Sequence, residues 1–147
     1  MNYTYNDKNP LTNGTIVTEE VSAAGNVSTD FSLSDAGKRA IILGGNIVLV
    51  CNGTVTNRVV KLFILTAGSA DVIEESFQSD NITAGQTRQV IFSKNSQEAD
   101  SNPAQHGHLN IPDSWIIEGS EIFRIKINNG QSGDAYTGRF RVLSYPI

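Results

Sequence analysis

The chain has 147 residues, of which 39% are hydrophobic and 18% charged, and it carries a formal net charge of −4 at pH 7. This length suits one domain with a substantial core, and the acidic balance argues against a dedicated nucleic-acid binder, which is usually strongly basic. No apolar run is long enough to span a membrane, and the first residues lack the cationic and apolar regions of a signal peptide.

The first fourteen residues, MNYTYNDKNPLTNG, are polar and show no periodicity. They include Pro10 and Gly14, which are residue types that interrupt regular structure. This composition predicts an extended polar N-terminal arm over residues 1–14, followed by a single β-sandwich domain over residues 15–147.

After the arm, short runs rich in Val, Ile, Thr and Phe alternate with turn-forming residues, which is typical of an all-β protein. The predicted strands cover residues 15–21, 39–43, 46–50, 58–65, 71–77, 87–92, 115–127 and 136–145. The sequence therefore predicts an antiparallel β-sandwich of about eight strands, either jelly-roll or immunoglobulin-like in topology.

The connections carry two further signals. Asn52 and Gly53 follow a strand and form a dipeptide that favours a tight hairpin turn. Residues 94–114 are rich in polar side chains and predict a long connection between strands.

Two of the predicted strands are apolar on both faces. In NIVLVC, residues 46–51, and in RVVKLFIL, residues 58–65, the apolar side chains do not alternate with polar ones. A sandwich strand with one solvated face would alternate. We therefore expect a second cover over these strands, and a neighbouring subunit is the favoured candidate over the long connection or the arm.

The segment HGHLNIPD resembles the first metal-binding motif of cupins, which are also jelly-roll barrels. His106 and His108 are two residues apart, so on a strand they would face one way, and Asp113 would supply a carboxylate. The resemblance is incomplete, because the glycine before the first histidine is missing, Asp stands in place of Glu, and there is no third histidine. We therefore favour a loop without a metal, and expect no cofactor.

The sequence shows no set of residues for nucleophilic catalysis. It lacks a G-x-S-x-G elbow, and Cys51, its single cysteine, lies in an apolar run where a cysteine is most often a small buried hydrophobe. The paired carboxylates Glu19 and Glu20 are adjacent in a strand and point to opposite faces, so they form no dyad. We expect a non-enzymatic protein.

A carbohydrate site would need aromatic platforms. The available rings are Trp115, Tyr136 and Tyr145, with Tyr3 and Tyr5 in the arm. The two arm tyrosines are at alternate positions and would face one way in an extended arm. For Trp115 we favour a partly buried anchor at the start of a strand.

The last 27 residues predict a hairpin with NNGQSGD as its turn. Phe123, Ile125 and Phe140 would face the core, which leaves four cations together on the outer face of the hairpin. These cations are Arg124, Lys126, Arg139 and Arg141.

Such a cluster needs anions, because like charges directly opposed in a sheet are destabilising. Glu19, Glu20 or Glu121 on neighbouring strands could supply them, or a partner protein could. We therefore predict a partner-binding role for the four cations and for Tyr3 and Tyr5.

The whole pattern resembles a capsid decoration, or cement, protein of a tailed bacteriophage. The resemblance lies in the arm NYTYNDKNPLTNG, in strands such as NITAGQTRQVIF and GSEIFRIKI, in the two-faced apolar sheet and in the lack of a catalytic set. Such proteins are commonly jelly-roll or immunoglobulin-like and sit as trimers on the capsid lattice.

The resemblance implies a structural protein of the virion, located on the capsid surface after synthesis in the host cytoplasm. It implies a homotrimer that contacts the major capsid protein, and neither nucleic acid nor membrane as a partner. A carbohydrate-binding module or receptor-binding tip domain is the alternative function, and a cupin-like metal-binding protein is a third.

Overall fold

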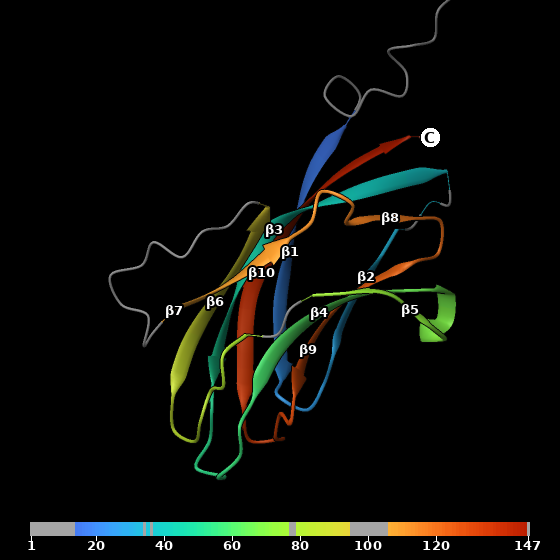
Figure 1. The fold of residues 1–147 in the computed structure, drawn as a ribbon. Coiled ribbons are helices and arrows are strands. Elements are labelled where there is room, and N and C mark those ends of the chain that lie inside the picture. The colour runs from blue at the N-terminus through green and yellow to red at the C-terminus, as the bar shows by residue number, and fades with distance from the viewer. Residues whose placement is uncertain (1–13, 34, 36, 77–78, 95–105, 147) are drawn as a thin grey trace, which may run out of the picture.

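The computed structural model describes residues 14–33, 35, 37–76, 79–94 and 106–146. Apart from one short 3₁₀ turn, Ala67–Ser69, the regular structure in these ranges consists of strands, which form two sheets packed face to face (Figure 1). Within the same ranges, no helix has both the length and the hydropathy that crossing a membrane requires.

The larger sheet has six strands, in the spatial order β1-β10-β3-β6-β7, with β8 paired to the first part of β3. Its strands are β1 (Thr15–Ala24), β3 (Lys38–Val50), β6 (Thr87–Lys94), β7 (His106–Ile111), β8 (Ile116–Glu118) and β10 (Ala135–Pro146). All pairs in this sheet are antiparallel except β6 with β7, which is parallel.

The smaller sheet has four antiparallel strands in the order β2-β9-β4-β5. Its strands are β2 (Thr29–Ser32), β4 (Val59–Leu65), β5 (Val72–Glu75) and β9 (Ile122–Asn128). β1 and β2, β3 and β4, β5 and β6, and β9 and β10 are each consecutive along the chain and lie in opposite sheets. This arrangement is a jelly roll, in which two-stranded ribbons wrap around the core.

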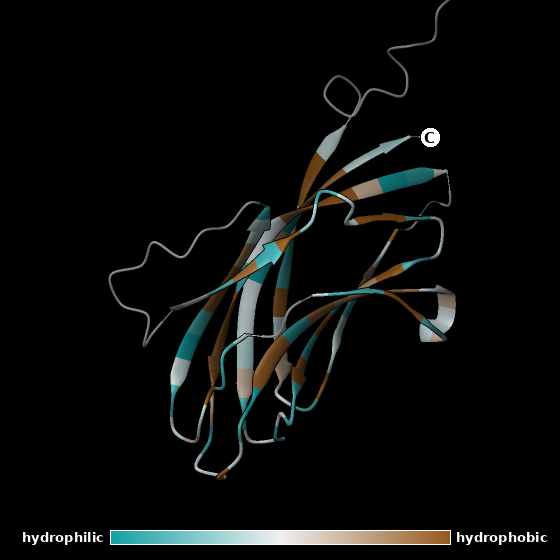
Figure 2. Ribbon diagram, viewed as in Figure 1, coloured by the Kyte–Doolittle hydropathy of each residue, from teal (hydrophilic) through white to brown (hydrophobic). Residues whose placement is uncertain are grey.

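The predicted β-sandwich is therefore confirmed, and of the two topologies left open the structure adopts the jelly roll. The side chains between the two sheets are apolar and buried. Figure 2 shows hydrophobic residues, in brown, along strands of both sheets. Phe123 of β9 and Phe140 of β10 meet across the sandwich with ring centroids 5.1 Å apart and the rings tilted by 69°. An edge-to-face pair of this kind stabilises the core beyond the area it buries.

Several predicted strand boundaries are wrong. Residues 39–43 and 46–50 form the single strand β3, because Gly44 and Gly45 pair with β10 and the strand continues through a bulge at Leu43. The predicted long connection over residues 94–114 contains β7, whose Leu109 and Ile111 are buried. β2 was also missed, since four residues show too little alternation to predict a strand.

The turns predicted between β3 and β4 and between β9 and β10 do not form hairpins. Asn52 and Gly53 lie between strands of different sheets, and Gly53 is not among the described residues with positive φ. The predicted β9–β10 hairpin is wrong for the same reason, since β9 and β10 face each other across the core. The inward residues Phe123, Ile125 and Phe140 are buried as predicted.

The strands with two apolar faces are covered in part by the chain itself. In β4, Val59 and Leu65 on the outer side are 7% and 4% exposed, so the ends of this face need no subunit. At its centre, Lys61 lies 5.7 Å from the centroid of the Phe63 ring. In β3, Val50 is 48% exposed, and its cover by a subunit stays a prediction.

Candidate contact surfaces

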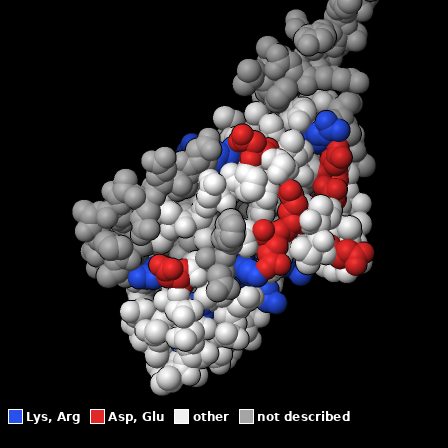
Figure 3. Space-filling model, viewed as in Figure 1, with Lys and Arg blue, Asp and Glu red and all other residues white. Residues whose placement is uncertain are grey.

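The described residues form two surfaces with distinct chemistry: the loop end of the sandwich and the outer face of the larger sheet. The loop end comprises the connections over residues 25–28, 51–57, 83–86 and 129–133, which gather at the lower end of the molecule in Figure 1. These four connections contain no Asp, Glu, Lys or Arg. Figure 3 shows almost no charged side chains at this end, whereas basic and acidic side chains lie next to one another above it.

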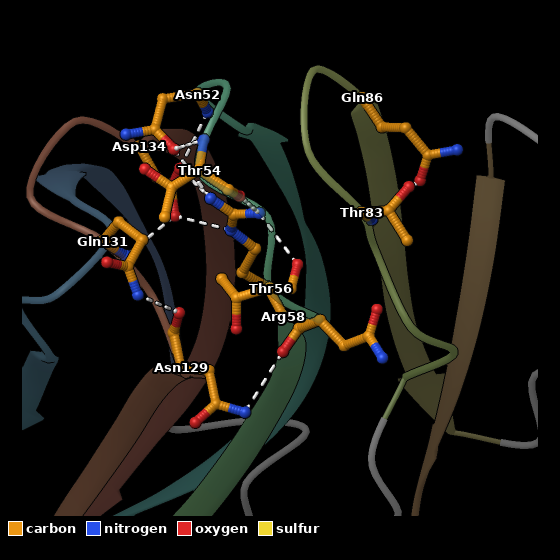
Figure 4. Close-up of polar contacts among 10 residues, drawn as sticks. Asn52, Thr54, Thr56, Arg58, Thr83, Gln86, Asn129, Gln131 and Asp134 are labelled. Atoms are coloured by element: carbon orange, nitrogen blue, oxygen red, sulfur yellow. Dashed lines mark hydrogen bonds and ion pairs between the residues drawn. The ribbon is translucent and has the colours of Figure 1, made fainter.

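A buried ion pair holds the loop end in shape. The Arg58 and Asp134 side chains are both 0% exposed, with Arg58 Nε donating to Asp134 Oδ2 at 2.9 Å and Nη2 donating to Oδ1 at 3.0 Å. Arg58 Nη1 donates to the carbonyl oxygens of Thr54 and Thr56, and Nη2 also donates to Asn52 Oδ1. One guanidinium therefore fixes the β3–β4 loop, as Figure 4 shows.

Asp134 ties two further segments to the same pair. Its carboxylate accepts from the backbone N–H groups of Asn52 and Gln131, and its carbonyl oxygen accepts from Gly25 N–H. Burial by itself raises the pKa of the Asp134 carboxyl, but hydrogen bonds from Arg58 and from the two N–H groups outweigh burial, so the pKa is lowered overall. The carboxylate is thus held in its charged form.

The loop end presents apolar side chains and amides to solvent. Val55 is 92% exposed, Val27 is 51% exposed, and both lie in these loops. A depression of about 380 Å³ adjoins the loops and is lined by amide side chains, Val59 and one cation. The amides and the cation are those of Asn57, Asn81, Lys126, Asn128 and Asn129.

The outer face of the larger sheet carries a shallow hollow of about 540 Å³ that runs from β1 across β10 and β3 to β6. Ile16, Leu43 and Ile91 are apolar residues of its lining, while Gly44 and Gly45 contribute no side chain. Arg139 and Arg141 of β10 also line it. We call this feature the sheet hollow.

Glycines are required where the strands approach each other at the sheet hollow. A Cβ on Gly45 would lie 2.3 Å from the Arg139 carbonyl oxygen, and one on Gly44 would lie 2.5 Å from that of Phe92. Gly44 also has φ of 142°, a backbone conformation that side chains rarely adopt. The hollow is therefore a product of the β3 bulge and of two positions that admit glycine alone.

The structure separates the four cations that the hairpin prediction placed together. Arg139 and Arg141 are exposed on the outer face of the larger sheet, and Arg124 and Lys126 lie on the opposite outer face of the molecule. Arg124 forms a two-fold hydrogen-bonded ion pair with Asp30, at 2.6 and 2.7 Å, and also donates to Ser69. Asp30 is thus the anion that pairs with Arg124, where we expected Glu19, Glu20 or Glu121.

The remaining cations lack such partners within the described part of the chain. Arg139 faces Glu20 of β1 in the strand register, and Arg141 faces Thr18, but neither guanidinium forms an ion pair with any described residue. Lys126 is opposite Lys61 in register and is exposed. Tyr3 and Tyr5 lie outside the described residues, so their predicted partner-binding role is untested.

Strand β5, at the edge of the smaller sheet, offers a surface of the opposite character. Val72 and Ile73 are 54% and 46% exposed. Asp71 precedes them and Glu74 and Glu75 follow, and of these three carboxylates only Glu75 is ion-paired, with Lys61, among the described residues. The strand thus combines exposed apolar side chains with acidic ones.

The aromatic rings considered for a carbohydrate platform are buried. Trp115, Tyr136 and Tyr145 are 1%, 0% and 8% exposed. The Tyr136 hydroxyl donates to the Val27 carbonyl oxygen and shares a hydrogen bond with Thr29. These rings anchor the core, and none of the three presents a face on which a sugar could stack.

The residues of the cupin-like motif lie partly on a strand and partly in the turn that follows it. His106 and His108 are in β7, whereas Asp113 is 83% exposed in the following turn, 3.8 Å from Lys94 Nζ. Within the described ranges, no group of three or more His, Cys, Asp or Glu side chains could hold a metal ion. Cys51 is buried as predicted, and burial raises the pKa of its thiol.

Sequence reasoning missed the Arg58–Asp134 pair and the acidic character of the exposed β5 edge. Arg58 opens a predicted strand and Asp134 closes a turn-rich segment, positions where charged side chains are usually solvated. No local pattern links two residues 76 positions apart. The exposure of Val72 and Ile73 depends on β5 being an edge strand, which the sequence does not specify.

No protein-family model matches the sequence, and no curated protein sequence matches it. Among solved structures, that of the Gx strain of infectious bursal disease virus is similar over 90% of this chain, with 15% identity and a TM-score of 0.45. T=1 particles of a mutant VP2 protein of the same virus match over 92%, with 11% identity and a TM-score of 0.40.

The VP2 subviral particle of that virus matches over 92% of this chain, with 10% identity and a TM-score of 0.40. In these three comparisons the chain spans only 33% to 34% of the other chain's length. These neighbours are therefore viral particle proteins whose likeness to this chain concerns the fold alone and carries no argument about function.

Proposed function

We propose that the chain is a non-enzymatic structural protein of a virus particle, which decorates the capsid surface and stabilises it through contacts with the major capsid protein and with sister subunits. The observation that carries the proposal is the outer face of the larger sheet. There an apolar hollow, two arginines without ion pairs among the described residues, and an edge of β1 that no described strand covers adjoin one another.

This combination suits a contact with protein. Protein interfaces are enriched in arginine, and exposed apolar patches mark sites of association. Ile16 of β1 is 61% exposed beside the hollow, and no described strand pairs with the outer edge of β1. The jelly roll occurs in viral capsid domains, lectins and cupins, so the fold admits this function without requiring it.

The resemblance of the sequence to decoration proteins supplies the kind of partner. In this proposal three copies assemble, the cations Arg124, Lys126, Arg139 and Arg141 serve contacts with protein, and the arm with Tyr3 and Tyr5 reaches a neighbouring subunit. Because Arg124 already pairs with Asp30, it takes part in the protein contact as an ion pair rather than as an unpaired cation.

The test is the composition and stability of particles of the virus that encodes the chain. Gradient-purified particles are analysed by mass spectrometry, and the purified chain is added back to particles from which it has been removed. We expect a fixed ratio to the major capsid protein and a higher temperature of genome release after addition. Absence from particles together with no binding on addition would overturn the proposal.

A receptor-binding or carbohydrate-binding tip is a second candidate, favoured by the loop end. That end is held by a buried ion pair, its loops are uncharged, and amide side chains line its depression. The buried rings remove the aromatic platforms that would have supported tight stacking of sugars. Binding on a glycan array that is lost in Asn81→Ala and kept in Gln89→Ala would favour this second function.

A further inference from the structure

We propose that the sheet hollow of one copy receives strand β5 of a second copy, so that copies of this chain join head to tail. The inference rests on the proposed function, because it specifies which surfaces the sister subunits use. It assigns Arg139 and Arg141 to this subunit contact.

The sheet hollow has the form of a receptor for an apolar side chain. Its lining includes Gly44 and Gly45, which leave the backbone of β3 uncovered, and the apolar residues Ile16, Leu43 and Ile91. A Cβ at either glycine would collide with neighbouring backbone, so the lack of side chains is built into the strand geometry. Apolar side chains are stabilised by such a lining because it removes them from water.

The two arginines in the lining of the hollow select the charge of its occupant. Arg139 and Arg141 alternate on β10, so both point out of the same face, and no described residue forms an ion pair with either. Among the residues opposite the two arginines in β1 and β3, Glu20 is the acidic one, and it pairs in register with Arg139. The hollow therefore fits a segment that bears both apolar and acidic side chains.

Strand β5 is a segment of this chain that meets the description. Val72 and Ile73 are about half exposed, and Asp71 before them is exposed and has no ion pair among the described residues. Glu74 after them accepts a hydrogen bond from Ser114. β5 is the edge strand of the smaller sheet, so a neighbour could approach it without displacing another described strand. Its charge and its apolar side chains complement those of the hollow.

Pairing of two β1 edges is a less suitable way to join copies. In an antiparallel pair of β1 strands centred on the middle of Thr15–Ala24, Glu19 of each copy would lie opposite Glu20 of the other. Opposed carboxylates disfavour that contact. The hollow and β5 are different surfaces, so their contact is heterologous and forms a ring if the rotation closes, as in a trimer.

The experiment uses two variants, each with one of the two surfaces disabled. The first is Arg139→Glu with Arg141→Glu, and the second is Asp71→Lys with Ile73→Lys. Each variant is studied alone and in an equal mixture by light scattering after size exclusion. Protein concentrations reach about 200 µM, because a contact between one strand and one shallow hollow is small and small interfaces bind weakly. Lys38→Glu is the matched control, because this exposed lysine is not part of the lining of the hollow.

We expect wild type and the control to exceed the 15.9 kDa mass of one chain, and each double variant to associate at least about a hundredfold more weakly. The mixture should regain association, because one variant keeps β5 intact and the other keeps the hollow. A wild type that stays monomeric, or a mixture that stays monomeric, would overturn the inference. Incorporation into particles is measured separately, so the proposed function would stand or fall on its own result.

Discussion

The loop end and the sheet hollow contain arginines in opposite situations. At the loop end, Arg58 is fully buried and all of its donor groups are directed at Asp134 and the β3–β4 loop. At the hollow, Arg139 and Arg141 are exposed and lack ion pairs with described residues. A buried guanidinium with all its bonds formed fixes the shape of a region, whereas an exposed one without partners remains available for contacts.

Replacing Arg58 should give the largest effect on stability. Arg58→Met leaves the Asp134 carboxylate buried without its counter-charge, and breaking such a pair costs about 3–5 kcal/mol of unfolding free energy. Urea unfolding followed by circular dichroism measures the loss. Arg141→Met should leave stability unchanged within about 0.5 kcal/mol.

A second variant separates the charge from the packing of Arg58. Arg58→Met combined with Asp134→Asn removes the buried charge and keeps a side-chain oxygen to accept from a backbone N–H. We expect the pair of substitutions to cost less than Arg58→Met alone. If the double variant were no more stable than the single one, the buried charge would not be the source of the loss.

The glycines beneath the sheet hollow provide the next largest effect. Gly45→Ala places a methyl group 2.3 Å from the Arg139 carbonyl oxygen, so β3 and β10 must move apart, at a cost of about 1–3 kcal/mol. Thermal unfolding monitors the change. Gly53→Ala is the control, because its Cβ meets nothing within 4 Å and φ there is not positive, and it should gain up to about 1 kcal/mol.

The pH dependence of stability tests the Asp134 carboxylate. Its pKa is lowered in the folded protein, so its contribution is fully present above the unfolded value of about 3.9 and is lost as pH falls through the folded pKa. Urea unfolding between neutral and strongly acidic pH should show this loss in wild type. Asp134→Asn should flatten the acidic part of the curve, and an unchanged curve would assign the loss to other carboxylates.

The smallest effect is expected at the exposed ion pair of Arg124 with Asp30. Despite hydrogen bonds of 2.6 and 2.7 Å, both side chains are partly solvated, so Arg124→Met should cost about 1 kcal/mol or less. Added salt should weaken the pair in wild type and leave the variant unaffected. A loss as large as that of Arg58→Met would remove the distinction between buried and exposed arginines.

The alternation of side chains along each strand predicted which of them face the core, but it did not predict which strands are neighbours. Phe123 and Phe140 are buried as expected, because alternation alone decides their face. Two apolar faces meet equally well when strands pair within one sheet and when they face each other across a sandwich. Only the first arrangement brings Arg124 and Arg139 together, and the structure has the second.

The candidate surfaces were predictable only in part. Arg139 and Arg141 were expected on an outer face and lie there, whereas the sheet hollow depends on the bulge in β3, where the sequence predicted two separate strands. The loop end depends on Arg58 reaching Asp134, which required knowledge of the tertiary fold. Local sequence patterns indicate which face of a strand a side chain lies on and where a strand ends, whereas these surfaces form where segments distant in the sequence meet.

The position of β10 has a consequence for how the protein forms. β10, the last of the described strands, lies between β1 and β3, and Thr15 pairs with Ser144. Contacts between positions so distant in sequence form slowly, because a long loop must close before they are gained. During synthesis, the edges of β1 and β3 that pair with β10 should therefore stay unpaired until residues 135–146 leave the ribosome, and a chain halted before that point would be prone to aggregate.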